Sequence, residues 1–349
     1  MKKLWLFLFV FIPFSAKAIG ASSYIVMDQD SGRVLEGKNT EKVSLIASIT
    51  KIMTAIVAIE YGNLEEVVEV DSSIIKAYGS GIYVQMGEEL TLDDLLYGLM
   101  LRSGNDAALA IASHVAGDVS SFVYLMNEKA RLLGMNNTSF VNPSGLEEND
   151  GSANTSTVYD MAILTKYAMK NEHYRRIVST EDIIVKSSLK TYKWFNKNKL
   201  LSSYEYCTGG KTGFTKKARR TLVTTATKDE MSLIVVTFND GNDFGDHRSL
   251  YEKYFNSYER VKVIDKEMSY GEEFFLNSDF YVIVNEKDKI ETKVSVDSLD
   301  DKIYGSIVGR VDVLLNGEEI GYRYLYYKKK SVTEDKSFIS KLLDFLKFW

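Results

Sequence analysis

A serine and a lysine three residues apart open an apolar helical pattern near the start of the chain. The run Ser48-Ile49-Thr50-Lys51 puts Ser48 and Lys51 on one face of a helix, where positions i and i+3 are neighbours. A serine hydroxyl is a poor nucleophile unless a base takes its proton. A lysine amine serves as that base only where burial and nearby cations lower its pKa. The pattern therefore predicts Ser48 as nucleophile and Lys51 as general base.

A second polar motif, Ser103-Gly104-Asn105, interrupts two predicted helical segments at residues 92–101 and 105–116. We expect the Ser103 hydroxyl to relay a proton to a leaving amine. The Asn105 amide carries both donors and an acceptor, and we expect it to orient a substrate carbonyl and to hold Lys51. The alternative is an ordinary helix cap or a solvated loop.

A third motif, Lys211-Thr212-Gly213, lies in a glycine-rich run that we expect on the edge strand of a sheet. Lys211 would add a cation that favours neutral Lys51 and attracts a substrate carboxylate. Glycine in a strand permits close approach of another backbone, so Gly213 would let a substrate lie beside the strand.

Each motif alone recurs by chance in a lysine-rich chain. Together they occur in order on a helix start, a helix break and a strand, within one predicted domain. This combination predicts a serine acyl-transfer enzyme.

The surrounding elements predict an α+β domain followed by a smaller all-β domain. Short apolar runs at residues 24–28 and 33–36 indicate a hairpin, helices follow, and β character returns after Tyr206. A sheet assembled from both ends of the domain is the simplest arrangement. We place the catalytic domain at residues 19–260, with a helix from His247 to Glu259, and the all-β domain at residues 261–331. The strands expected in the latter are Phe280 to Val284, Ile290 to Val296 and Ser306 to Leu315.

The two ends of the chain indicate export and membrane contact. Two lysines, an apolar stretch from Leu4 to Phe14 and an Ala-Lys-Ala site predict a signal peptide at residues 1–18. Residues 332–349 are predicted to form an amphipathic, membrane-associating helix, although a helix docked on its own domain is the alternative. We therefore expect an exported protein at the outer face of the cytoplasmic membrane, in the cell envelope.

Composition excludes several other classes. The net charge of −5 offers no basic field for nucleic acid. We find no zinc-like spacing, phosphate loop or dinucleotide fingerprint, and we expect no cofactor and no metal. Cys207 is the only cysteine, so no intrachain disulfide forms, and a packed residue is a simpler interpretation than a nucleophile.

With these motifs the chain resembles the serine D,D-peptidases that share the penicillin-recognising fold with class A β-lactamases. It most resembles the low-molecular-mass penicillin-binding proteins of the D-alanyl-D-alanine carboxypeptidase type. The resemblance covers residues 20–258 strongly. It rests on the segments Ala47 to Thr54, Leu101 to Ala108, Leu133 to Met135, Asn142 to Leu146, Ser156 to Asp160 and Gly210 to Thr215.

The resemblance implies an antiparallel sheet flanked by helices. It also implies an enzyme that removes the terminal D-alanine from peptidoglycan stem pentapeptides through an acyl-enzyme on Ser48, in peptidoglycan maturation and cell-shape control. β-Lactams would be its covalent inhibitors. The oxyanion hole would be the backbone N–H groups of Ser48 and Phe214, and preorganised donors of this kind are commonly the largest electrostatic contribution. The implied catalytic residues are Ser48, Lys51 and Ser103, and the implied substrate-binding residues are Asn105, Lys211, Thr212, Gly213, Phe214 and Arg248.

The family also has an arginine that reads the substrate's C-terminal carboxylate. Arg248 is our candidate for it, and Arg220 is a rival. Arg219 stands where the family often has glycine, so the resemblance does not predict the backbone conformation after Thr215.

Three other functions compete with the carboxypeptidase. A Ser-His-Asp hydrolase would need one of His114, His173 and His247, and no G-x-S-x-G elbow is present. A class A β-lactamase needs an E-x-x-L-N segment between the second and third motifs, whereas Glu273 to Asn277 follows the third. A binding protein that kept the fold and lost turnover would not need all three motifs.

Overall fold

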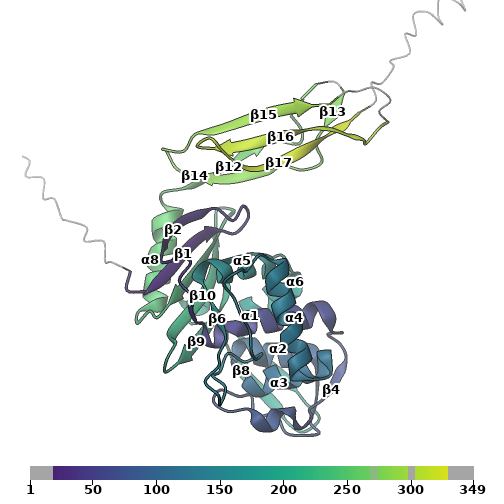
Figure 1. Ribbon diagram of the computed structural model, residues 1–349, viewed down its shortest axis with the longest axis vertical. Coiled ribbons are helices and arrows are strands. Elements are labelled where there is room, and N and C mark those ends of the chain that lie inside the picture. Colours follow the sequence, from purple (N-terminus) through teal and green to yellow (C-terminus); the bar gives the residue numbers. More distant parts are fainter. Residues whose placement is uncertain (1–18, 269, 272, 298–302, 329–349) are drawn as a thin grey trace, which may run out of the picture. The chain divides into compact units, whose positions relative to one another are not determined.

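The computed structural model describes residues 19–268, 270–271, 273–297 and 303–328. These residues form two compact units, the first from residues 19–228 and 232–253 and the second from residues 229–231 and 254–328 (Figure 1). The signal peptide predicted at residues 1–18 and the amphipathic helix predicted at residues 332–349 lie outside the described residues.

A five-stranded sheet in the order β2-β1-β11-β10-β9 forms one layer of the first unit. The N-terminal hairpin of β1 and β2 pairs with the last strands of the unit, since Ser23 lies opposite Phe238 in an antiparallel register. The prediction of a sheet assembled from both ends is therefore confirmed, and β9 is its edge strand. The strands are β1 (Ser23–Asp28), β2 (Val34–Lys38), β9 (Cys207–Thr215), β10 (Arg219–Lys228) and β11 (Met231–Phe238).

Helices pack on the two faces of this sheet (Figure 1). Successive strand residues point to opposite faces. Val223 and Val236 join the helical core on one face, and their neighbours Thr224 and Thr237 bond to His247 of α8 on the other. The helices are α1 (Lys51–Tyr61), α2 (Leu92–Leu101), α3 (Asn105–Ala116), α4 (Val119–Leu132), α5 (Val158–Ala168), α6 (Glu172–Ser179), α7 (Leu200–Ser203) and α8 (Asp243–Phe255), with 3₁₀ turns η1 (Ala47–Thr50) and η2 (Ser72–Lys76).

Helix α1 lies at the centre of the core. Its first eight residues, from Lys51 to Ala58, are all buried, because the segment is apolar on every side except for two polar groups that find partners inside. Three small two-stranded sheets surround the helices. They are β3 (Ser44–Leu45) with β6 (Thr155–Ser156), β4 (Val67–Glu69) with β5 (Glu89–Thr91), and β7 (Asp182–Lys186) with β8 (Thr191–Phe195).

Most helix boundaries follow the local sequence. Thr91 and Asp94 form a capping box at the start of α2, and α3 is followed by Gly117 at φ +81°. The helix predicted from His247 instead begins at Asp243 and ends at Phe255. Acidic residues are favoured in the first turn of a helix, and Glu259 starts a strand, so both ends of the prediction were four residues too late.

The second unit is built from strands in the described residues, as predicted. Its four-stranded sheet has the order β13-β17-β16-β15, and β12 pairs with β14. Val282, Val311 and Leu325 lie in its small apolar core. Its strands are β12 (Glu259–Ile264), β13 (Phe274–Phe275), β14 (Phe280–Val284), β15 (Ile290–Val296), β16 (Ile307–Leu315) and β17 (Glu318–Tyr327).

Within the described ranges, no single helix has the length and apolar content needed to cross a bilayer. The bent pair α3 and α4 passes that test together, by length and composition alone.

Candidate active site

Ser48 lies in the 3₁₀ turn η1, which runs directly into α1. The turn rests against the sheet, where the Thr221 hydroxyl donates to the carbonyl of Ile46 at 2.9 Å. Strand β9 passes so close that a Cβ on Gly213 would lie 3.0 Å from the backbone nitrogen of Ser48. The backbone of Gly213 therefore lies beside Ser48, while the substrate contact expected of this glycine stays a prediction.

Lys51 is fully buried, with its amine surrounded by oxygen atoms. Its Nζ lies 3.3 Å from Ser48 Oγ and 2.7 Å from Asn105 Oδ1, and it also donates to the carbonyl of Ser144. A neutral amine has two N–H donors and one lone pair. Asn105 and Ser144 take the two donors, which leaves the lone pair for the Ser48 hydroxyl.

The electrostatic surroundings favour that neutral form. Burial holds the pKa of Lys51 well below its ordinary value, and the positive charges of Lys211 and Lys197 lower it further, while Asp106 acts in the opposite direction. Lys211 is also buried, and its Nζ donates to the carbonyl of Thr212 at 2.8 Å. Burial, with a smaller contribution from Lys197, lowers the pKa of Lys211 to about 7.

The second motif forms the sharp turn between α2 and α3. Ser103 is buried and has φ +61°, a conformation that costs a non-glycine residue free energy and is concentrated at functional sites. Asn105 is the first residue of α3. Its backbone nitrogen donates to Ser80 at 2.8 Å and its Nδ2 donates to Tyr78 at 2.6 Å. Asn105 thus joins Lys51 to the segment at residues 78–88.

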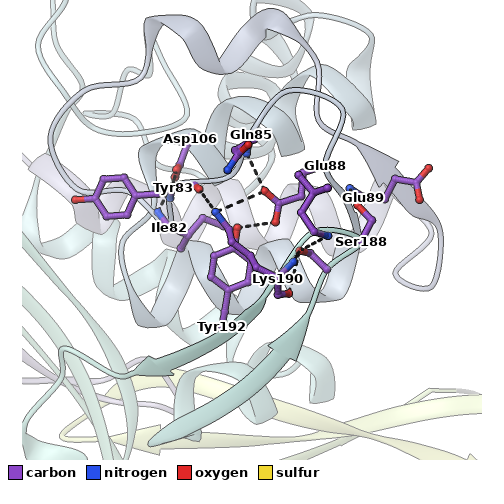
Figure 2. A network of polar contacts seen from close by, with 11 residues as sticks. Ile82, Tyr83, Gln85, Glu88, Glu89, Asp106, Ser188, Lys190 and Tyr192 are labelled. Carbon is purple, nitrogen blue, oxygen red and sulfur yellow. Dashed lines mark hydrogen bonds and ion pairs between the residues drawn. The ribbon is translucent and has the colours of Figure 1, made fainter.

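A buried polar network holds that segment in place (Figure 2). Asp106 accepts from the backbone nitrogens of Ile82 at 3.0 Å and Tyr83 at 2.6 Å. Glu88 is fully buried and accepts from the Tyr192 hydroxyl at 2.7 Å. Because the β7–β8 hairpin supplies Tyr192, elements distant in sequence fix the backbone that contacts Asn105.

The third motif lies on β9 as predicted. Phe214 is exposed and pairs in register with Arg220 of β10. The hairpin closes without glycine, because Arg219 itself adopts φ +63° opposite Thr215. This is the conformation that glycine adopts most easily, and here an arginine occupies it.

The structure does not bring Arg248 to the other predicted residues. Arg248 is exposed on α8, with its guanidinium 5.7 Å from the centre of the Tyr204 ring, and α8 covers the face of the sheet away from Lys51. The helix begins four residues earlier than predicted, so the position of Arg248 could not be read from the sequence. Arg220 lies on the strand next to β9, where Asp243 binds its guanidinium through two hydrogen bonds of 3.0 and 2.6 Å.

The loop that supplies the Ser144 carbonyl was not predicted to take part. Asn142 Oδ1 accepts from the backbone nitrogens of Ser144 at 3.2 Å and Gly145 at 2.8 Å. The Thr54 hydroxyl of α1 donates to the carbonyl of Pro143 at 2.7 Å. Gly145 has φ +85°, and a Cβ there would lie 2.0 Å from the carbonyl oxygen of Ala47. Its sequence signal was the family-like segment Asn142 to Leu146, which gave no role.

The histidines and the cysteine have other surroundings. His247 is buried between two threonines, and burial lowers its pKa to about 3. His114 lies 3.5 Å from Glu66, and His173 contacts Arg176. Burial raises the pKa of Cys207 to about 11. None of the hydrogen bonds of these groups in the described part of the chain reaches Ser48, which argues against a Ser-His-Asp hydrolase.

Two further sequence observations concern metals and β-lactamases. In the described ranges no group of three or more His, Cys, Asp or Glu side chains could hold a metal ion. Residues 273–277, the E-x-x-L-N match, belong to the second unit around β13, which is consistent with a chance match.

Known proteins are similar to this chain in both sequence and fold. The family model described as D-alanyl-D-alanine carboxypeptidase matches residues 12–242. D-alanyl-D-alanine carboxypeptidase DacF of Bacillus subtilis is 37% identical over 224 residues, which are 62% of this chain and 57% of DacF. DacC of Escherichia coli is 28% identical over 379 residues, with 97% of this chain and 93% of DacC covered. The chain thus spans little more than half of DacF and nearly all of DacC.

Solved structures of two such proteins are similar to the structure of this chain. Penicillin-binding protein 5 of Haemophilus influenzae superimposes with a TM-score of 0.74 at 26% identity, over 90% of this chain and 98% of that one. A D-alanyl-D-alanine carboxypeptidase of Mycobacterium tuberculosis gives a TM-score of 0.65 at 31% identity, over 70% of this chain and 95% of that one.

Proposed function

This chain belongs to the D-alanyl-D-alanine carboxypeptidase family of serine peptidases, and we propose that it removes the terminal D-alanine of peptidoglycan stem pentapeptides through an acyl-enzyme on Ser48. One observation carries the assignment to these atoms. The amine of Lys51 is fully buried among Ser48, Asn105 and Ser144, in an environment that lowers its pKa well below the ordinary value and so favours the neutral form.

Acylation begins with a proton transfer from the Ser48 hydroxyl to Lys51 Nζ. The Ser48 oxygen forms a bond to the carbonyl carbon of the penultimate D-alanine. The resulting oxyanion accepts hydrogen bonds from the backbone N–H groups of Ser48 and Phe214. The peptide C–N bond then breaks, and the departing D-alanine nitrogen takes the proton from Lys51 by way of the Ser103 hydroxyl. An ester on Ser48 and free D-alanine result.

Deacylation uses the same base. Lys51, again neutral, takes a proton from a water molecule, whose oxygen adds to the ester carbonyl. The C–O bond to Ser48 breaks, the proton returns to the Ser48 oxygen, and the shortened peptide leaves as a carboxylic acid that ionises in water.

Strand β9 provides the binding surface for the peptide. An edge strand has free backbone groups that pair with an added extended segment, and Gly213 presents no side chain there. The ammonium of Lys211 and the hydroxyl of Thr212 receive the substrate's C-terminal carboxylate. Asn105 orients the peptide carbonyl through its amide.

A β-lactam follows the same acylation route, because its strained amide imitates the D-Ala-D-Ala bond. The chain lacks the E-x-x-L-N carboxylate between the second and third motifs, so the penicilloyl ester on Ser48 should persist. This distinguishes a carboxypeptidase from a class A β-lactamase, which destroys penicillin catalytically.

The cellular position follows from the ends of the sequence. Residues 1–18 direct export, and residues 332–349 bind the outer face of the cytoplasmic membrane through their apolar side. Deletion of residues 336–349 should release an active enzyme from membranes. Unchanged membrane association of that truncated protein would contradict this part of the proposal.

Intact-protein mass spectrometry after exposure to penicillin tests the assignment. One adduct per chain is expected, mapped to Ser48, together with release of D-alanine from a stem pentapeptide. Ser48→Ala should abolish both, and Lys51→Ala should reduce both by about 10²–10⁴-fold because it removes the base. An adduct on another residue, or penicillin loss without an adduct, would overturn the proposal.

A further inference from the structure

Lys197 lies outside the three sequence motifs, in the turn that follows β8. Its backbone nitrogen donates to the carbonyl of Leu101 at 3.2 Å, two residues before Ser103. The next residue, Asn198, donates to the carbonyl of Gly209 on β9 at 3.2 Å. Through this backbone bond of Lys197 and the side-chain Nδ2 of Asn198, the segment connects the strand of the third motif to the end of α2, just before the turn of the second.

The side chain of Lys197 reaches the segment that contacts Asn105. Its Nζ donates to the Ser80 hydroxyl at 3.1 Å. The carbonyl of Ser80 accepts from the backbone nitrogen of Asn105 at 2.8 Å, and Asn105 Oδ1 accepts from Lys51. A short chain of hydrogen bonds thus fixes the Lys197 ammonium relative to the catalytic base.

Arg102 is a neighbouring charge of the same sign as Lys197. No described Asp or Glu forms an ion pair with Lys197, Lys51 or Lys211, since each of the described ion pairs involves other residues. Lys197 is half-buried, and burial together with Arg102 lowers its pKa.

Five parts of the chain contribute polar or charged groups around the Lys51 amine, among which the 3₁₀ turn η1 contributes Ser48. Helix α3 brings Asn105 and Asp106, β9 brings Lys211, the turn after β8 brings Lys197, and the Asn142–Gly145 loop brings the Ser144 carbonyl. Asp106 is the one carboxylate among these named groups. Its oxygens accept from the backbone nitrogens of Ile82, Tyr83 and Ala107, and its charge acts on the amine in the direction opposite to Lys211 and Lys197.

We propose that Lys197 is an electrostatic positioning residue of this active site, which supplies a second positive charge, beside that of Lys211, that keeps the proton off Lys51. This inference rests on the proposed function, in which Lys51 is the base. A positive charge nearby destabilises the protonated form of a lysine. Lys197 affects Lys51 and Lys211 in the same direction, so one substitution should change two titrations together.

The expected sign follows directly. Loss of the Lys197 charge raises the pKa of both buried lysines. The acid limb of kcat/KM, which reports deprotonation of Lys51, should move to higher pH. The alkaline limb, which reports deprotonation of Lys211, should move the same way. A shift of roughly half a unit to one unit lowers the rate about three- to tenfold on the acid side and leaves the maximum nearly unchanged.

Three variants of the full chain test this. Lys197→Gln removes the charge, Lys197→Arg retains it, and Lys199→Gln removes an equal charge two residues away on an exposed side chain. For each protein, D-alanine release and the rate of penicillin adduct formation are measured from pH 5 to 10. Only Lys197→Gln should shift both limbs, and Lys197→Arg should restore the wild-type profile.

Two results would overturn the proposal. In the first, Lys197→Gln loses activity equally at every pH, which indicates a structural role through Ser80. In the second, its limbs coincide with those of Lys199→Gln. Failure of the proposed function would look different, because the wild-type protein itself would then form no Ser48 adduct.

Discussion

Replacement of Asn105 by aspartate changes one neutral oxygen partner of the catalytic lysine into a charged one. The Asn105 Oδ1 atom lies 2.7 Å from Lys51 Nζ, and aspartate is nearly isosteric. An opposite charge this close stabilises the ammonium and raises its pKa by about 1–3 units. Each unit lowers the neutral fraction of Lys51 tenfold. Acylation at neutral pH should fall by about 10- to 10³-fold and should recover as pH rises toward the new pKa.

The natural comparison is Asn105→Ala. Both substitutions lose the Nδ2 hydrogen bond to Tyr78, but alanine adds no charge. The rate of penicillin adduct formation, followed by intact mass from pH 5 to 10, separates the two effects. Asn105→Ala should be slower at every pH with its acid limb in place, whereas only Asn105→Asp should shift that limb upward. Identical profiles for the two variants would refute the claim that Lys51 acts as a neutral base.

Three further substitutions test separate features of the first unit. Gly213→Ala should slow penicillin acylation by about 10²-fold or more. The new Cβ would lie 2.4 Å from Thr221 Oγ1 and 3.0 Å from the Ser48 nitrogen, and it would displace the donors of the oxyanion hole. An unchanged rate in a folded variant would show that the Ser48 nitrogen does not bind the oxyanion. Arg248→Ala should change turnover of free-acid peptides by less than about twofold relative to C-terminally amidated ones. Removal of an arginine that binds the substrate carboxylate would instead cost about 1.5–3 kcal/mol for free acids alone. A selective loss for free acids would therefore show that Arg248 binds the carboxylate. Asp240→Asn should stabilise the protein by about 1–2 kcal/mol at pH 8 and by much less at pH 4. Burial raises the pKa of Asp240 from 3.8 to about 6, and one of its buried oxygens has no hydrogen-bond partner, so the cost of ionisation grows between these two pKa values and is complete above about pH 6. Thermal unfolding at the two pH values measures the difference, and equal stabilisation at both would contradict the raised pKa.

The proposed catalytic residues could be selected from the sequence because their chemistry depends on side-chain type and local spacing. Ser48 and Lys51 are three residues apart at the start of a helix, and the other motifs lie on a helix break and a strand that the sequence also indicates. The order of the three motifs along the chain indicated the class of enzyme. These features are local, so periodicity and turn signals expose them.

The role of the Ser144 carbonyl could not be predicted from the sequence, because every residue has a backbone carbonyl oxygen. Its role depends on the turn that Asn142 and Gly145 impose and on the approach of that turn to α1. Lys197 was missed for a related reason. Its influence depends on which charges lie near it in space, and its spacing from Lys211 in sequence carries no such information.

Arg248, whose role stays a prediction, shows the opposite case. The type of residue was suitable, but helix α8 begins at Asp243, and the starting point of a helix determines which side chains lie on which face. Because the family pattern did not fix the residue at which α8 begins, it could not predict the position of the Arg248 side chain.

The pairing of β1 with β11 also bears on how the first unit folds. These are the first and the last strands of its sheet in chain order, so β1 lacks one neighbour until nearly the whole unit has been synthesised. Contacts between such distant segments close large loops and slow folding. A chain that crosses a membrane through a secretion channel must remain unfolded until it emerges, and this topology delays stable folding until the last strand arrives.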